Sequence, residues 1–523
     1  MYTDGALYLG LAGGVRVTMP LNMCSRHGLI AGASGTGKTI TMKVMAESFS
    51  DAGVPVFLCD VKGDVSGIAE PGVRSDGMEK RIDKFGLREH FSYKGYPVSF
   101  WDIYQEKGHP VRCTVSDMGP DLLSRLLGLS PAQQGVLEIV FKIADDRGLL
   151  LLDMKDLRAM LGYVGDRRDE FTTTYGSISA QSLGAIVRSL LPLERQGGDL
   201  FFGEPDLDIR DWFRTAPDGR GVVNVLDCVK LVQNPTLYAS FLLWMLSELF
   251  EVLPEAGDLD KPKLVFFFDE AHMLFADAPK ALVQKLEQVV KLIRSKGVGL
   301  YFVTQSPGDI PDSVLAQLSN RVQHALRAYT PGEQKAVKAA AQAFRENPAF
   351  KAADVITELG VGEALVSVLD GEGVPGVVQR TSIVCPQSLM APAREDTRRS
   401  AMAGDGMDKY DEGVDSESAY EVLLGEREQA EKQAALDAER EAFEKEKAAF
   451  EAQKAKEEET AKKKAEKEAE AQRRKLEKAL EREEAQRQKA AERRKAQLER
   501  QLINTGAQVL KRGLMGTLFG GRR

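Results

Sequence analysis

The chain has 523 residues, more than one typical domain holds, and this length predicts about three structural units. Hydrophobic residues make up 43% of the chain and charged residues 28%, a composition typical of folded globular proteins and not of fully disordered ones. The sequence has no run of about 18 apolar residues, so we expect no membrane-spanning helix.

Charge is distributed unevenly along the chain. The net charge is −8, but the segment 1–424 carries a larger excess of acids than the whole chain, whereas the segment 501–523 carries bases and no acid. Phosphate contacts require a basic face, so a strongly acidic unit does not favour nucleic-acid binding over its whole surface. A basic channel inside an acidic shell is still compatible with these totals.

The start of the chain and its cysteines predict the compartment. The first residues contain an acid and no basic region before their apolar residues, so they do not resemble a signal peptide. The five cysteines are far apart and form no CxxC pair, which indicates neither a zinc knuckle nor a disulfide framework. We therefore expect a cytoplasmic protein.

Short apolar runs alternate with helical patterns over residues 1–390. Such alternation predicts a mainly parallel sheet covered on both faces, so the expected fold class is α/β. One helix between the runs is clear, because apolar residues from Leu282 to Ile293 repeat on a single helical face. The runs are HGLIAG (27–32), VPVFLCD (54–60), YPVSFWDI (96–103), GVVNVLDC (221–228), KLVFFFDE (263–270) and GLYFVTQ (299–305).

A phosphate-binding loop follows the first of these runs. The residues GASGTGKT match G-x-x-x-x-G-K-[ST], with a strand predicted before them and an amphipathic helix after them. Glycines let successive backbone N–H groups surround phosphate oxygens, and the helix N-terminus adds positive potential. Lys38 is expected to reach the β- and γ-phosphates, and the Thr39 hydroxyl to bind Mg²⁺. The predicted nucleotide-binding residues are Gly32, Ala33, Ser34, Gly35, Thr36, Gly37, Lys38 and Thr39.

The alternation of strands and helices is interrupted in the middle of the chain. Residues 117–200 contain helical patterns with no strand between them. We therefore expect a mainly helical insertion at 117–215. It would divide one nucleotide-binding core into a first part at 1–116, with the phosphate loop, and a second part at 216–390.

Two acids directly follow the apolar strand LVFFF in the second part of this core. Burying a strand that ends in carboxylates is costly unless the acids face a ligand or a cation. Beside a phosphate loop, Asp269 is expected to bind Mg²⁺ either directly or through a water molecule, and Glu270 is expected to act as the general base or to position the attacking water. The guanine-reading element N-K-x-D and the protein-kinase sequence H-R-D-L-x-x-x-N are both missing, which favours ATP hydrolysis.

The next strand ends in a polar residue, Gln305, which we expect near Asp269 and the γ-phosphate. An amide there can bond the phosphate or the attacking water and report hydrolysis. Arg294 lies at the end of the helix that precedes this strand and is the first candidate for an arginine that completes a neighbouring subunit's site. Arg327 is the second candidate and Arg321 the third.

The composition changes after residue 390. Residues 391–420 are small, polar and acidic and predict a linker. Residues 421–502 lack Pro, lack Gly after Gly425, and favour a long charged helix, which over 425–500 would span about 115 Å. Leu436, Phe443 and Phe450 repeat every seven residues, so either a loose coiled coil or a single solvated helix with Glu/Lys pairs is compatible.

The last residues, 503–523, combine apolar, glycine and basic residues. Their apolar residues could lie on one side of a helix flanked by lysine and arginine. Such a basic tail could contact DNA, a protein partner or an anionic membrane surface, so peripheral membrane attachment is also compatible with the sequence.

Four strings together resemble a known family. GASGTGKT, LVFFFDE, IRSKGVGLYFVTQSP and SNRVQHALRAYTP, in this order, are similar to the HerA/FtsK branch of RecA-like motor ATPases. The most similar group is the bacterial HerA-like helicase-domain family, with RHGLIAGASGTGKT at Arg26–Thr39. The resemblance covers roughly residues 1–390. HerA itself has a barrel-like domain before its phosphate loop, and the segment before Gly32 is too short to hold it.

The resemblance implies a homo-hexameric ring, ATP at the subunit interfaces and a central pore for double-stranded DNA. Carried over by motif, Lys38 and Thr39 bind nucleotide, Asp269 and Glu270 serve Mg²⁺ and hydrolysis, Gln305 senses the phosphate, and Arg294 acts in trans. Two functions follow from the sequence. One is an ATP-driven motor on DNA, and the other is an ATP-dependent switch or scaffold that acts on a protein or membrane partner through the C-terminal helix.

Overall fold

The structure is a computed structural model that describes residues 1–275, 280–465, 478 and 480–497. It divides into two units, Met1–Glu421 and Val422–Arg523. Within the described residues, the first unit is built on one twelve-stranded sheet, and seven of the strands form its parallel part. In spatial order these are β10 (Asn320–His324), β4 (Gly28–Ala31), β9 (Val298–Thr304), β8 (Leu264–Phe268), β5 (Val56–Asp60), β7 (Val223–Asp227) and β6 (Val98–Trp101). The six predicted apolar runs are all strands of this part.

Five antiparallel strands extend the sheet beyond β10. Four of them contain polar or charged residues and the fifth, ALYLGLA, is apolar, but none of the five was predicted from the sequence. They are β1 (Tyr2–Thr3), β2 (Ala6–Ala12), β3 (Val15–Pro20), β11 (Glu363–Ser367) and β12 (Gln379–Ile383). β2 pairs with β12, and β1 and β3 both pair with β2 at the far edge.

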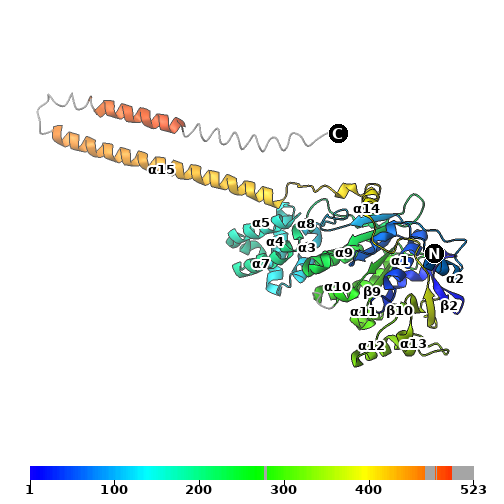
Figure 1. Cartoon of the computed structure of the whole chain (residues 1–523). Coiled ribbons are helices and arrows are strands. Elements are labelled where there is room, and N and C mark those ends of the chain that lie inside the picture. Colours follow the sequence, from blue (N-terminus) through cyan, green and yellow to red (C-terminus); the bar gives the residue numbers. More distant parts are fainter. Residues whose placement is uncertain (276–279, 466–477, 479, 498–523) are drawn as a thin grey trace. The chain divides into compact units, whose positions relative to one another are not determined.

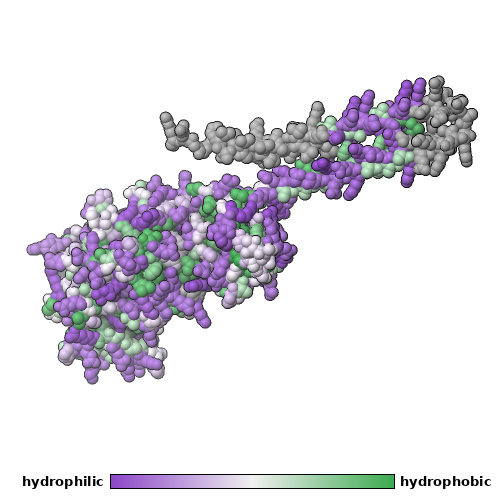
Figure 2. All heavy atoms as spheres, turned by 180° about the vertical axis from the view of Figure 1, so that it is seen from behind, coloured by the Kyte–Doolittle hydropathy of each residue, from purple (hydrophilic) through white to green (hydrophobic). Residues whose placement is uncertain are grey.

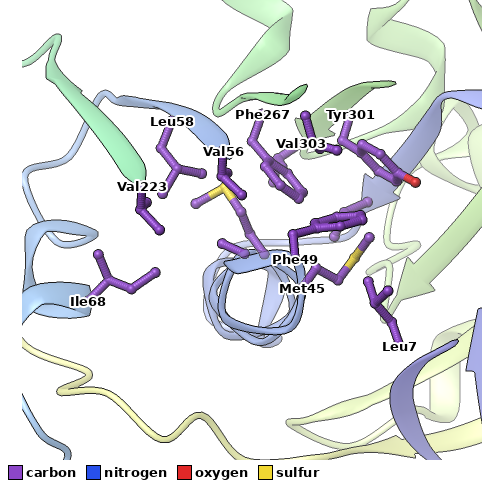
Figure 3. Packing of buried hydrophobic residues seen from close by; sticks show 14 of the residues in the cluster. Leu7, Met45, Phe49, Val56, Leu58, Ile68, Val223, Phe267, Tyr301 and Val303 are labelled. Atoms are coloured by element: carbon purple, nitrogen blue, oxygen red, sulfur yellow. The ribbon is translucent and has the colours of Figure 1, made fainter. Parts of the chain in front are cut away.

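The helix after the phosphate loop, α1 (Lys38–Asp51), packs across one face of the sheet. Its Met45 and Phe49 are buried against Val56, Phe267 and Tyr301 from three parallel strands (Figure 3). Successive residues of a strand point to opposite faces, so each of these strands can also supply the other core layer. This packing fixes α1 on the sheet and therefore positions the loop at its N-terminus.

The other face is covered by α9 (Pro235–Val252) and α10 (Lys280–Leu292), which pack against each other (Figure 1). The predicted apolar face of α10 is confirmed, because all its members from Leu282 to Ile293 are buried. Aromatic rings fill the layer below, where Phe57 lies 4.3 Å from Trp212 between ring centroids. Two shorter helices, α12 (Pro331–Gln342) and α13 (Ala352–Glu358), form a small second core beside β10 and β11.

Residues 115–201 are helical and contain no strand among the described residues. The first helix of this region, Val115–Leu126, packs against α9, which joins the region to the sheet domain. We keep the boundaries 117–215 as a prediction for the insertion. The helices are α3 (Val115–Leu126), α4 (Pro131–Arg147), α5 (Met154–Asp166), α6 (Arg168–Tyr175), α7 (Ala180–Arg195) and α8 (Gly198–Phe201), and α2 (Asp76–Lys84) and α11 (Asp312–Leu315) lie outside this region.

Residues 391–420 belong to the first unit and pack against its sheet domain, and we call this segment the strap. It contains α14 (Glu395–Met402), whose Arg398 is buried with its guanidinium 4.7 Å from the ring centroid of Phe100. The expectation of a linker does not hold for this segment. Although its composition is polar, a few of its residues are buried, among them Met407 and Tyr410 at 3% exposure each.

A buried histidine fastens the strap to the sheet domain. His109 lies with Nε2 3.1 Å from an oxygen of Asp405 and Nδ1 2.6 Å from an oxygen of Asp411. Nearby, Arg112 donates a hydrogen bond of 2.8 Å to the backbone oxygen of Tyr410. Burial lowers the pKa of His109, but the hydrogen bonds and charges of the two aspartates outweigh it, and the pKa is raised. The strap is therefore held by charge as well as by apolar packing.

The second unit contains most of α15 (Ala419–Ala465) and a helical segment within 480–497 that runs antiparallel to it. Arg494 pairs with Glu446 at 2.6 Å, and Lys454 pairs with Glu484 at 2.9 Å. The guanidinium of Arg487 lies 4.6 Å from the Phe450 ring centroid. Both helices carry mainly hydrophilic side chains on the face in Figure 2.

The described residues within 425–500 therefore do not lie on one straight helix of about 115 Å, because Glu446 and Arg494 would then be about 72 Å apart instead of in contact. The predicted tail, 503–523, lies outside the described residues. Within the described residues, no helix is both long and apolar enough to span a bilayer. The five cysteines are all buried and unpaired.

Candidate functional site

The phosphate loop connects β4 to α1 and is held by the strands on both sides of β4. The Gly32 N–H donates to the Thr304 oxygen at 3.2 Å, and the Ala33 N–H donates to the Ala325 oxygen at 2.8 Å. Gly35 and Gly37 have φ values of 75° and 114°, in the left-handed region that favours glycine. The loop can therefore turn its backbone N–H groups inward at the N-terminus of α1.

Lys38, the first residue of α1, is held inside this loop. Its Nζ donates to the Gly32 oxygen at 2.6 Å and to the Ala33 oxygen at 3.2 Å. Burial lowers the pKa of Lys38, and the carboxylates of Glu270 and Asp269 act in the opposite direction. The ammonium group thus lies in the electrostatic field of the acids across the site. The hydroxyl-bearing Thr39 follows it in the first turn of α1.

His324, at the end of β10, supports the loop from behind and was missed in the sequence analysis. Its Nε2 lies 2.8 Å from Thr41 Oγ1 of α1, and its Nδ1 lies 2.9 Å from the Glu363 oxygen of β11. A Cβ atom on Gly32 would lie 2.5 Å from His324 Cβ, so this glycine is required by close approach. Burial lowers the pKa of His324 to about 4, and the ring is neutral near pH 7.

Asp269 directly follows β8 and is 2% exposed. Neither of its carboxylate oxygens has a hydrogen-bond partner within the described residues. Burial is the main cause that raises the pKa of Asp269 to about 6, and Lys62 acts in the opposite direction. Buried carboxylate oxygens without a partner are suited to a hard cation such as Mg²⁺.

The number of metal-ligating side chains at the site shows what kind of Mg²⁺ site it can form. Among the described residues, no group of three or more His, Cys, Asp or Glu side chains could enclose a metal ion. Mg²⁺ usually binds through one or two carboxylates together with substrate phosphates and water. Asp269 and Thr39 fit that pattern better than a site made by protein ligands alone.

Glu270 adopts an unusual backbone conformation beside Asp269, with φ at 47°. Such a value is uncommon for a residue other than glycine and is often found at functional sites. Its carboxylate is paired with Lys62, and Gln305 Nε2 donates to its Oε2 at 3.3 Å. Burial raises the pKa of Glu270, but the hydrogen bond and charge of Lys62, with Gln305, lower it overall.

The strand order explains this arrangement. β9 lies between β4 and β8, so the phosphate loop, Gln305 and the Asp269–Glu270 pair follow the carboxyl ends of three neighbouring parallel strands. Lys62 follows β5, the next strand beyond β8. Lys62 was not predicted as a site residue, although charged residues after the apolar run VFLCD are the same signal that identified the acids after LVFFF.

The three candidate arginines occupy different places. Arg294 lies in the turn before β9, at the opposite strand end from Gln305, and pairs with Asp258 at 2.9 Å. The length of β9 separates the two ends by about 20 Å. Arg321 is half-buried and donates to the Leu318 oxygen at 2.9 Å, a structural contact. Arg327 is exposed beyond β10, at the edge that carries the phosphate loop.

Known proteins provide a comparison for this site. A family model described as "Helicase HerA-like C-terminal" matches residues 11–523. The "DNA double-strand break repair helicase HerA" of Sulfolobus acidocaldarius is 20% identical over 386 residues, covering 70% of this chain and 67% of that protein. A probable helicase of Methanocaldococcus jannaschii is 21% identical over 359 residues, covering 67% of this chain and 62% of that protein.

A solved structure supports the fold. The plasmid coupling protein TrwB, in complex with a non-hydrolysable GTP analogue, superposes with a TM-score of 0.50 and 15% identity. The match covers 75% of this chain and 94% of TrwB. The predicted α/β class with a RecA-like P-loop core and a mainly parallel sheet is thereby confirmed.

Proposed function

The chain belongs to the helicase HerA-like C-terminal family, and on that basis we propose that it is an ATP-hydrolysing, ring-forming motor that moves along or remodels double-stranded DNA. The observation that carries this proposal is the position of the phosphate loop opposite Asp269, Glu270 and Gln305 at one edge of the sheet. A phosphate chain cradled by the loop would extend toward these three side chains.

Each side chain has a proposed role in hydrolysis. Lys38 would bind the β- and γ-phosphates in place of the loop carbonyls that it now contacts. Thr39 and Asp269 would hold Mg²⁺, which would offset negative charge on the phosphates. Glu270 would accept a proton from the attacking water. Gln305 would orient the Glu270 carboxylate through the hydrogen bond between them.

The choice of DNA as the polymer rests on family membership and on the similarity to the Sulfolobus relative, which is named as a DNA double-strand break repair helicase. The excess of acids over bases in the segment 1–424 requires that DNA contacts be confined to a local basic surface. A ring of subunits around a pore can provide such a surface. We propose a homo-hexamer, with one arginine of each subunit completing the site of its neighbour.

The test of the proposed function is ATP turnover by the full chain with and without duplex DNA at low salt. The proposal expects duplex DNA to change turnover by more than about twofold. It also expects the effect to weaken as salt rises, because phosphate contacts release counterions. Glu270→Gln protein, prepared in the same way, measures any contaminating ATPase. A change of less than twofold in a wild-type protein that does hydrolyse ATP would contradict a DNA motor.

A second candidate function is an ATP-dependent switch or scaffold for a protein partner or an anionic membrane. The observation that favours it is the separate second unit, whose antiparallel charged helices share ion pairs with each other. In that case, removing residues 425–523 would leave ATP turnover unchanged and would abolish binding to the partner. DNA-dependent turnover that survives this truncation would favour the motor.

A further inference from the structure

Lys62 pairs with Glu270, the proposed general base, from a strand that is not part of the phosphate loop. It follows β5, which pairs directly with β8, and its ammonium group forms an ion pair with Glu270. The Lys62 side chain is 43% exposed, whereas that of Glu270 is 6% exposed. The lysine can therefore move into solvent or toward a ligand more easily than the glutamate can.

The backbone around Lys62 is fixed by a buried acid. Asp60 is 2% exposed, and its two carboxylate oxygens accept hydrogen bonds from the Gly63 N–H at 2.7 Å and the Val65 N–H at 3.1 Å. These bonds close the turn on both sides of Lys62. The backbone of Lys62 is therefore fixed, while its long side chain can rotate to reach either of two anions.

Two anions, the Glu270 carboxylate and a bound γ-phosphate, could pair with the Lys62 ammonium group. Lys38 is hydrogen-bonded to loop carbonyls, so Lys62 is the lysine that neutralises Glu270. Lys38 and Lys62 are close enough for each positive charge to affect the other. A γ-phosphate bound by Lys38 would place a second, more highly charged anion within the same group of side chains.

We propose that Lys62 is a γ-phosphate-dependent switch that holds Glu270 when ADP is bound and moves to the γ-phosphate when ATP is bound. The exchange would release Glu270 to activate water only when there is a bond to hydrolyse. After hydrolysis and phosphate release, Lys62 would return to Glu270. This inference rests on the proposed function of the chain as an ATPase and names a residue that couples its nucleotide state to its catalytic carboxylate.

The inference predicts how nucleotide preference changes. We would measure the affinities of ADP and of a non-hydrolysed ATP analogue, each with Mg²⁺, by calorimetry on the full chain. Lys62→Met should weaken binding of the analogue by about tenfold, the usual effect of losing one charge-assisted contact, and should leave ADP binding within about twofold. Lys62→Arg, which keeps the charge, should retain most of the preference for the analogue.

Glu270→Gln provides an independent measurement of the exchange. An amide competes poorly for the ammonium group, so this variant should bind the analogue more tightly than wild type. The gain should disappear in the Lys62→Met, Glu270→Gln double variant, because Lys62 carries it. Additive effects of the two substitutions would contradict competition between Glu270 and the γ-phosphate for Lys62.

Lys107 is a matched control at the same edge of the sheet. Its ammonium group pairs with Asp227, at the end of β7, at 3.0 Å, and its side chain is 46% exposed. Lys107→Met should change neither affinity. If Lys62→Met behaves like Lys107→Met, or weakens ADP and the analogue equally, Lys62 is a structural ion-pair residue and the inference is wrong. A wild-type chain that binds neither nucleotide would overturn the proposed function itself.

Discussion

Gln305 donates a hydrogen bond of 3.3 Å to Glu270 from the end of the neighbouring parallel strand. This bond joins the predicted sensor to the predicted general base within one subunit. Gln305→Ala should therefore disorganise Glu270 and reduce turnover about 10- to 100-fold, with ATP binding retained. Glu270→Gln should reduce turnover further, because the amide cannot accept the proton. Loss of nucleotide binding in either variant would indicate a structural role instead.

Lys38→Ala should remove ATP hydrolysis, because the buried ammonium group of the phosphate loop would be lost. We expect turnover to fall about 100-fold or more in a steady-state phosphate-release assay. Lys80→Ala, at an exposed position of α2, is the matched surface control and should behave as wild type. Wild-type turnover in a folded Lys38→Ala protein would contradict the assignment of the loop.

The arginine that acts in trans can be identified with mixed oligomers. Arg294 lies at the opposite end of β9 from Gln305. Arg294 could therefore contact only a phosphate that is bound by a neighbouring subunit. Arg294→Ala should bind ATP normally and fail to hydrolyse it. Mixing it with Lys38→Ala subunits should restore part of the turnover, wherever an intact arginine faces an intact loop.

Arg327→Ala, made and mixed in the same way, tests the alternative arginine on the edge of the phosphate loop. Recovery with Arg327→Ala but not with Arg294→Ala would transfer the role to Arg327. The absence of recovery with both variants, in oligomers proven to be mixed, would contradict catalysis in trans by either residue.

The strap changes the expected result of truncation. From the sequence, cutting near residue 395 should cost little stability, but the structure predicts that this cut exposes the site of Met407 and Tyr410. Ending the chain at residue 395 should lower the thermal midpoint by roughly 5 °C or more, because several buried side chains lose their packing. Ending it at residue 424 keeps the strap and should leave the midpoint almost unchanged. Equal midpoints in calorimetry would show that the strap adds no stability.

His109 should give the strap a pH dependence. Its pKa in the folded protein is raised above the ordinary value near 6.5 by Asp405 and Asp411, against the effect of burial. The stabilisation is therefore complete below about pH 6.5 and is lost as pH rises through the raised pKa. His109→Gln cannot carry this charge, so its stability relative to wild type should improve between pH 6 and pH 9. A constant difference in urea midpoints over that range would contradict the prediction.

The sequence predicted those parts of the site that depend on local strings. GASGTGKT and LVFFFDE each contain a strand, its end and the chemical groups that follow, so Lys38, Asp269 and Glu270 needed no knowledge of the strand order. Lys62 follows an apolar run, as the two acids do, but its assignment to this site required the pairing of β5 with β8, and that of His324 required the pairing of β10 with β4. Those pairings join segments that are far apart in the chain and leave no periodic signal in either segment.

The strap was missed for a related reason. Its composition is polar, and its few buried residues are not spaced as in a helix or a strand. Their burial depends on surfaces formed by distant residues such as Phe100 and His109. For the long charged segment, in contrast, composition did predict the secondary structure. Its described residues are helical, as the composition predicts, but the contact between Glu446 and Arg494 was not predicted.

The central claim is that ATP hydrolysis at this site drives movement along duplex DNA, and displacement of a third DNA strand from a triplex tests it most directly. The full-length protein should release the labelled third strand in the presence of ATP and Mg²⁺. Lys38→Ala protein, or the wild type with a non-hydrolysed analogue, should leave the triplex intact. Wild-type protein that hydrolyses ATP on this DNA and still leaves the third strand in place would contradict the claim.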